Sequence, residues 1–309
     1  MPLTIQPLHQ SLAAEITGVD IAQGVDAATV AALEAANNRY PVLVLRGQKI
    51  DKEQQVAFAG MFGPLELMGR NLKEDNYTSK IHKHLADISN VDGEGKVYSA
   101  EDRRRLSGLG DALWHTDSSF KAVPAKYSML YGDRLPPDGH VTEFADLRAA
   151  YDALDDAMKD KIADLVAEHS IMRSRSIIGF EFDAEERAVL PAVKQRVVRL
   201  HPGSKRMTLY LASHASHIVG WPVPEGRLLL LDLIGHATQP QFVYRHDWRD
   251  GDLVWWDDRC TMHRARPREN GNAREMRRAT VGDYASTLDQ PYRMAAAEQK
   301  RESAILYPI

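Results

Sequence analysis

A histidine and an aspartate stand two positions apart in the segment Trp114-His115-Thr116-Asp117. Residues i and i+2 of an extended strand point to the same side, so His115 and Asp117 can bind one metal ion together. His263, far along the chain, offers a second imidazole. Two histidines and one carboxylate on one face of a metal leave the opposite positions open, which suits non-haem Fe(II) and the binding of O₂. These three residues are the candidate metal ligands.

The same three residues also allow other chemistry. A zinc hydrolase would use them to activate a metal-bound water. A non-catalytic binding protein of the cupin type would hold a small molecule without needing Asp117. A His-x-Asp pair alone is a weak motif because it also occurs by chance in surface turns. Dependence of activity on O₂ separates the iron enzyme from the zinc hydrolase, and an Asp117→Ala variant separates both from the binding protein.

Composition limits the setting of this chemistry. The chain has 309 residues, with 39 basic and 43 acidic side chains and a net charge of −4, so no charge bias indicates nucleic acid or a membrane surface. One cysteine, Cys260, excludes an internal disulfide framework and favours a reducing compartment. Residues 1–7 lack the apolar segment of a secretory signal, and no apolar run approaches the ~20 residues of a membrane helix. We expect a cytoplasmic protein.

Short strands separated by Gly, Pro and Asp turns dominate the second half of the chain, which predicts a sandwich or barrel rather than a parallel βαβ sheet. The expected strands are 42–45, 127–131, 141–145, 197–200, 207–211, 242–246, 252–256 and 278–283. The expected helices are 26–39, 51–62, one beginning at 146, 156–167 and 225–237. Together they predict one domain, mainly β, whose core is wrapped by helices.

Residues 67–112 are polar and irregular, apart from a short apolar piece at 86–91 that reads as a strand. Polar connecting segments beside a site often close over it. The segment therefore has two interpretations, an active-site lid or a solvated loop, and the sequence does not choose between them.

Several longer motifs occur in one order along the chain. They are Ile16–Asp20, Phe62–Glu66, Trp114–Phe120, Thr142–Tyr151, His214–His217, Tyr244–His246, Gly251–Val254, Asp258–Cys260 and Arg277–Thr280. Together they resemble the Fe(II)/2-oxoglutarate-dependent dioxygenases of the taurine dioxygenase type, and within them the group that acts on 2,4-dichlorophenoxyacetate. The resemblance implies a double-stranded β-helix, or jelly roll, over residues 1–309. It also implies Fe(II), 2-oxoglutarate and O₂ as cofactor and co-substrates, and a homo-oligomer.

The resemblance places the co-substrate and the substrate on two arginines. Arg274 lies 11 positions after His263 and matches the arginine that pairs with the far carboxylate of 2-oxoglutarate, with Thr142 as the hydroxyl partner. A planar guanidinium bonds both oxygens of a carboxylate. Arg278, 15 positions after His263, matches the residue that binds the acidic group of the substrate. The two arginines share parity, so both can face the interior from one strand, and a buried arginine favours an anionic substrate.

Further candidates for the substrate pocket are His214, His217, Asn90 and Ser118. The resemblance implies that the two histidines lie beside the substrate; the alternative is that they are structural and bonded by their surroundings. One departure is visible. Where the family usually has Gly-Gly-Asp-Thr, this chain has Gly139-His140-Val141-Thr142, so the turn before Thr142 is altered.

The resemblance also implies the reaction. Hydroxylation of an aryloxyalkanoate next to its ether oxygen gives a hemiacetal, which collapses to a phenol and a 2-oxo acid such as glyoxylate. 2-Oxoglutarate is converted to succinate and CO₂ in the same turnover. The alternative within the family is oxidation of another small anion, such as a taurine-like alkylsulfonate, because one arginine suits either head group.

Overall fold

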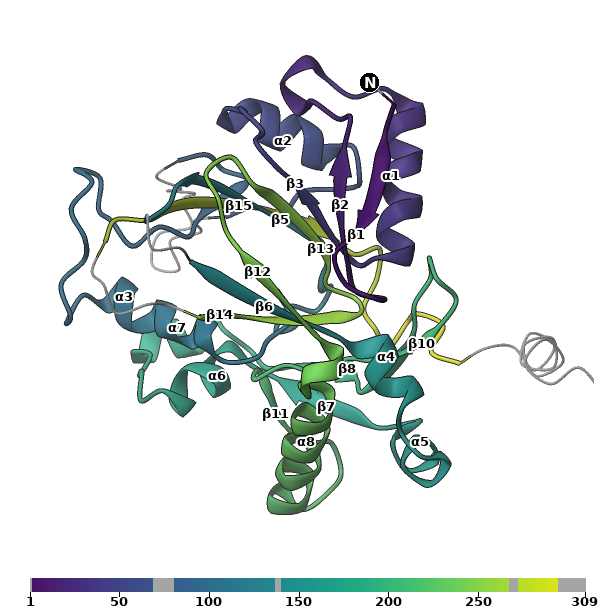
Figure 1. Ribbon diagram of the computed structural model, residues 1–309. Coiled ribbons are helices and arrows are strands. Elements are labelled where there is room, and N and C mark those ends of the chain that lie inside the picture. The colour runs from purple at the N-terminus through teal and green to yellow at the C-terminus, as the bar shows by residue number, and fades with distance from the viewer. Residues whose placement is uncertain (1, 69–80, 137–139, 267–271, 294–309) are drawn as a thin grey trace, which may run out of the picture.

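The computed structural model describes residues 2–68, 81–136, 140–266 and 272–293 (Figure 1). In this part of the chain the largest sheet has seven strands, and its neighbours are antiparallel except for β2 and β3. In sheet order the strands are β1 (Thr4–Pro7), β2 (Ala13–Thr17), β3 (Val42–Leu45), β13 (Leu253–Asp257), β5 (Ala125–Arg134), β15 (Glu275–Gly282) and β4 (Leu85–Asp87).

A second, antiparallel sheet faces the first across a shared apolar core (Figure 1). It has the order β12 (Val243–Asp247), β6 (Val141–Asp146), β14 (Thr261–Arg266). Leu130, Trp256 and Met276 of the large sheet pack with Phe144 of β6 in this core. The two sheets form a β-sandwich, and β14 of the second sheet carries His263. Two smaller antiparallel sheets contain β7 (Val166–His169), β8 (Val193–Arg196) and β11 (Ala215–Ile218), and β9 (Val198–Leu200) with β10 (Met207–Leu209).

The large sheet is buried on both faces, which explains why β13 is a continuous run of buried residues. Trp255 points away from the second sheet and packs against Phe58 and Phe62 of the segment around α2 (Lys52–Gly60). Its neighbour Trp256 points to the other face and packs against Phe144. Alternate residues of a strand point to opposite faces, so this Trp-Trp pair contributes one large side chain to each core.

Local signals begin the long helices where the sequence predicts them. Asp26 caps α1 (Ala27–Arg39) by accepting from Thr29 N–H at 2.8 Å, and Asp51 and Gln54 form a capping box at α2. α8 (Val223–Ala237) packs against β11 through its buried leucines. The remaining helices are α3 (Arg103–Gly108), α4 (Leu147–Asp152), α5 (Asp156–Ile162), α6 (Ile171–Ile177) and α7 (Ala184–Ala188), with short 3₁₀ turns η1 (Ile21–Gln23), η2 (Leu109–Ala112) and η3 (Pro240–Phe242).

The expected class, mainly β with flanking helices, is confirmed, and the sheets stack rather than close into a barrel. Several predicted bounds were wrong, and two of them differ by four residues or more. The helix expected at 156–167 ends at Ile162, and Val166 already begins β7. The strand expected at 86–91 is the shorter β4. Part of the predicted lid, residues 69–80, lies outside the described residues. No described helix is long and apolar enough to span a membrane.

Candidate active site

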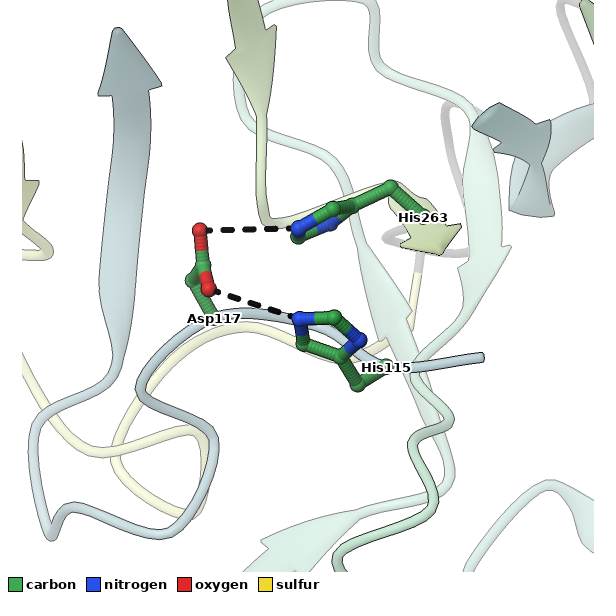
Figure 2. A group of neighbouring side chains, drawn as sticks. All are labelled: His115, Asp117 and His263. Carbon is green, nitrogen blue, oxygen red and sulfur yellow. Dashed lines mark ion pairs between the residues drawn. The ribbon is translucent and has the colours of Figure 1, made fainter. Parts of the chain in front are cut away.

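The three candidate ligands converge at one end of the sandwich (Figure 2). His115 lies between η2 and β5, and His263 lies on β14. The two backbones are joined by reciprocal hydrogen bonds, His115 N–H to His263 O at 3.0 Å and His263 N–H to His115 O at 2.8 Å. One potential ligand atom from each of His115, Asp117 and His263 lies within 4.8 Å of the others. The structure thus brings together residues that are distant in sequence, close enough to bind one ion.

Both imidazoles present a nitrogen to the Asp117 carboxylate (Figure 2). Nε2 of His115 lies 3.8 Å from Oδ1, and Nε2 of His263 lies 3.9 Å from Oδ2. Nδ1 of His115 donates to the carbonyl of Leu113 at 2.8 Å, which leaves the lone pair on Nε2. Burial and the neighbouring His115 lower the pKa of His263 well below its usual value. Both rings are therefore suited to binding a metal through Nε2.

Asp117 is held as an anion in a buried position. Ser128 Oγ donates to its Oδ2 at 2.8 Å, and Arg278 Nη1 donates to its Oδ1 at 2.6 Å. Burial alone raises the pKa of Asp117, but the Arg278 guanidinium and then the two imidazoles outweigh it and hold that pKa well below the usual range. The carboxylate is ready to bind a cation at neutral pH.

A neighbouring aspartate anchors the backbone of this ligand. Asp258 Oδ1 accepts from the Asp117 N–H at 3.1 Å and from Trp256 Nε1 at 3.0 Å. Burial, and then the charge of Asp117, raise the pKa of Asp258 well above its usual value. The two carboxyl groups of this buried site thus have pKa values shifted in opposite directions, and Arg278 donates a hydrogen bond to Asp117.

A cavity of about 920 Å³ opens beside the two imidazoles. His115, His263, Arg274, Arg278 and Thr142 all face it, and its apolar wall comes from residues such as Ile88, Leu109, Leu130 and Met276. Arg274, Met276 and Arg278 alternate along one side of β15 and its approach, as their parity predicts. Arg277 points the opposite way, where Gln55 and the Ile50 carbonyl bind its guanidinium.

Arg274 is a cation without an anion in the described residues. Its Nη2 donates to the Ile88 carbonyl at 3.0 Å, its Nη1 lies 3.1 Å from His140 Nε2, and its buried Nε has no partner there. Burial lowers the pKa of Arg274, and Asp111 only partly opposes this. A guanidinium placed in this way gains most from an incoming carboxylate.

Thr142 on β6 is oriented by Trp248. The indole Nε1 donates to Thr142 Oγ1 at 2.9 Å. A hydroxyl that accepts one hydrogen bond still has its own proton to donate. Because Thr142 and Arg274 line the same cavity, one carboxylate can contact both.

The four further substrate candidates are placed differently from one another. Asn90 lines the cavity, where its Oδ1 accepts from the backbone N–H of Arg274 at 2.7 Å. Ser118 follows the ligand Asp117 in a left-handed conformation, with φ 52°, and its Oγ donates to Glu66 at 2.9 Å. Ser118 is absent from the cavity lining that the described residues form. Asn90 thus supports the arginine, and Ser118 supports the turn that carries Asp117.

The two histidines of the His-x-x-His pair point into different surroundings. His214 is buried, is bonded through Nδ1 to Ser174 Oγ at 2.9 Å, and packs edge-on against His115 with 6.0 Å between ring centroids. His217 lies on β11 with its Nδ1 2.8 Å from Ser216 Oγ. Neither belongs to the cavity lining within the described part of the chain. A serine hydroxyl is the partner of Nδ1 in each ring.

Three residues that the sequence interpretation missed shape the site: Ser128, Asp258 and His140. Ser128 had a signal, because it is a polar residue at a fully buried position of a strand whose alternate residues, Tyr127 and Met129, are core. The spacing of Asp258 and His140 in the sequence gives no signal of a role in the site. Each acquires its contact from a segment distant in sequence.

Two histidines that line a cavity, with one aspartate beside them in a two-layered β-fold, are typical of a non-haem metal centre of the jelly-roll oxygenase class. The chain belongs to the taurine catabolism dioxygenase TauD, TfdA family, whose model matches residues 4–280.

Similar proteins cover nearly the whole chain. The chain is 43% identical to the alpha-ketoglutarate-dependent 2,4-dichlorophenoxyacetate dioxygenase of Cupriavidus pinatubonensis, over 92% of this chain and 99% of that one. It is 37% identical to the (S)-phenoxypropionate/alpha-ketoglutarate-dioxygenase of Sphingobium herbicidovorans, over 91% and 96%. The crystal structure of AAD-2 in complex with Mn(II) and N-oxalylglycine superposes with a TM-score of 0.86 at 45% identity, covering 94% of this chain and all of that one.

Proposed function

We propose that this chain oxidises a small aryloxyalkanoate with Fe(II), O₂ and 2-oxoglutarate. The observation that carries the proposal is one cavity lined both by the two histidines of the His115–Asp117–His263 cluster and by Arg274, a guanidinium with no carboxylate partner in the described residues. The first element suits a ferrous ion, and the second suits a dicarboxylate. Family membership and the names of the similar proteins support 2-oxoglutarate-dependent dioxygenase activity.

His115, Asp117 and His263 would hold the iron. They fit it because Asp117 is ionised, His115 presents an oriented Nε2, and neutral His263 presents its own Nε2. When bound, the iron supplies the activation of O₂ coupled to the conversion of 2-oxoglutarate to succinate and CO₂. Arg274 and Thr142 bind the far carboxylate of 2-oxoglutarate, and thereby fix the keto-acid end toward the cluster.

Arg278 is proposed to bind the acidic group of the substrate. It lies between the cavity and Asp117, with 20% of its side chain exposed. The apolar wall near Ile88, Leu109 and Met276 suits an aryl ring. Hydroxylation next to the ether oxygen gives a hemiacetal, which breaks to a phenol and a 2-oxo acid such as glyoxylate.

The test is succinate release from purified protein with Fe(II) in air, across a panel of aryloxyacetates, 2-aryloxypropionates and taurine. We expect phenol and succinate in equal amounts with an aryloxy acid. Turnover of taurine without turnover of aryloxy acids would instead support the alkylsulfonate alternative, for which a taurine dioxygenase of Burkholderia xenovorans is a more distant relative at 28% identity. Activity that survives without O₂ and needs Zn²⁺ would support a hydrolase.

Two variants assign the arginines. Arg274→Ala should raise the 2-oxoglutarate requirement by on the order of 10²-fold, because a bidentate charged pair is lost. Arg278→Ala should mainly lower the affinity for the aryloxy acid. Equal effects of both variants on both ligands would contradict the separate roles.

We further propose one dioxygenase domain over residues 1–309, with a lid formed by residues 67–112. Ile88, Asn90 and Tyr98 from this segment already contribute to the cavity wall, which supports the proposal. Protection of the segment from proteolysis by 2-oxoglutarate is the expected result. A homo-oligomer is proposed from the family and is measured by light scattering on the purified protein. A cytoplasmic location is proposed from the single, buried Cys260.

A further inference from the structure

His140 lines the same cavity as Arg274 and Thr142. It is 5% exposed and directly precedes β6. Its carbonyl accepts from the backbone N–H of Trp248 at 3.1 Å, and the same Trp248 orients Thr142. This hydrogen bond fixes the backbone of His140, and with it the position from which the imidazole side chain extends.

The ring of His140 contacts the guanidinium directly. Arg274 Nη1 lies 3.1 Å from Nε2 and 3.4 Å from Nδ1, so it can donate to whichever nitrogen carries no proton. Burial, and then the charge of Arg274, lower the pKa of His140 to about 3. The ring is neutral at physiological pH and accepts rather than repels. The other amino group of the guanidinium, Nη2, is held by the Ile88 carbonyl at 3.0 Å.

We propose that His140 is a positioning residue for Arg274 and limits the length of the 2-oxo diacid that the cavity accepts. The inference rests on the proposed function of Arg274 as the co-substrate arginine. Bonds at both amino groups fix the guanidinium plane, so less freedom is lost when a carboxylate binds. The imidazole also fills the space beside Arg274 and Thr142 that a longer chain would need. The site should therefore favour five-carbon 2-oxoglutarate over six-carbon 2-oxoadipate.

The experiment separates two properties of the His140 side chain, its hydrogen-bond acceptor and its volume. Binding of 2-oxoglutarate and of 2-oxoadipate to the Mn(II)-loaded protein is measured by calorimetry without turnover, in wild type and three variants. His140→Gln keeps an acceptor and should bind 2-oxoglutarate within about threefold of wild type. His140→Leu keeps volume alone and should bind about tenfold more weakly, or ~1.4 kcal/mol. His140→Gly should weaken the binding of 2-oxoglutarate and raise the affinity for 2-oxoadipate relative to that for 2-oxoglutarate about tenfold.

Controls decide which idea fails. His236→Leu removes a histidine that bonds the Ala150 carbonyl away from the cavity, and should leave both affinities unchanged. If Arg274→Ala leaves 2-oxoglutarate binding unchanged, the proposed co-substrate site itself is wrong. If Arg274→Ala abolishes binding while His140→Leu binds like wild type, only the positioning role of His140 is overturned. Unchanged diacid selectivity in His140→Gly overturns the length limit.

Discussion

In the part of the chain that the structure describes, two buried clusters contain a histidine and an aspartate close enough to share a metal ion. They are His115–Asp117–His263 and His201–Asp257–Cys260, and in both the potential ligand atoms lie within 4.8 Å of one another. In the first cluster the imidazoles face a cavity. In the second, His201 Nδ1 accepts from the Ser204 backbone and its Nε2 bonds Asp257 at 2.9 Å. Proximity of ligand types does not make a metal site; free lone pairs and access do.

The arginines beside the two aspartates differ in the same way. Arg259 bonds Asp257 through Nε at 2.9 Å and through Nη2 at 2.6 Å, with its side chain 5% exposed. Arg278 makes one bond to Asp117 and is 20% exposed, toward the cavity. One ion pair is complete within the fold, and the other still offers donors to a ligand.

Asp117→Ala should have the largest effect of any change to either cluster. The triad loses its only anionic ligand, so iron should no longer bind with stoichiometric occupancy, and succinate release should fall by on the order of 10³-fold. Metal content after gel filtration and succinate formation are the two measurements. A variant that keeps one iron per chain would contradict the assignment of Asp117.

Asp257→Asn tests the opposite cluster. The change leaves Arg259 buried without its charge partner, so the free energy of unfolding in urea should fall by about 3–5 kcal/mol. Iron bound per folded chain should not change, because Asp257 has no free lone pair facing a ligand. Loss of iron at unchanged stability would make the second cluster a metal site and remove the distinction.

The cluster that faces the cavity, His115–Asp117–His263 (the open cluster), could be predicted from the sequence. The cluster His201–Asp257–Cys260 (the closed cluster) could not. His115 and Asp117 stand two residues apart in a motif that resembles a known family. The strand expected to carry both residues was wrong, because His115 forms an isolated bridge with His263 and Asp117 already lies in a turn. His201 and Asp257 have no such spacing, since β9 and β13 become neighbours only through tertiary packing. The contact between His140 and Arg274 is equally non-local and was missed for the same reason.

The fold shows the same division between local and distant information. Caps at Asp26 and Asp51 predicted helix starts because the signals lie within four residues of each other. The order of the large sheet, with β13 between β3 and β5, depends on pairings across the whole chain. The short helices α6 and α7 were not predicted, although local signals begin both. Ser170 accepts from the Met172 N–H at the start of α6, and Asp183 and Glu186 form a capping box at α7.

His201→Gln should change the pH dependence of the free energy of unfolding, an effect smaller than those expected for Asp117→Ala and Asp257→Asn. Burial lowers the pKa of His201 from 6.5, although Asp257 opposes it. The unfolded chain therefore takes up a proton at a higher pH than the folded one, and this stability is present above about pH 6.5 and lost as pH falls. Between about pH 7 and about pH 5, wild type should lose up to ~1.4 kcal/mol per pH unit more than the variant. Equal slopes in urea unfolding would contradict this.

Cys260 gives the smallest expected effect and the sharpest check on the closed cluster. The thiol is fully buried, its Sγ lies 4.0 Å from the Asp257 carbonyl, and burial, then the Asp257 charge, raise its pKa. A protonated thiol neither binds metal nor reacts with alkylating reagents. Cys260→Ala should lower stability by about 1 kcal/mol and leave iron content and succinate release unchanged. Alkylation of wild type should follow the opening of the fold, so fast labelling that Zn²⁺ prevents in the folded protein would identify Cys260 as a ligand after all.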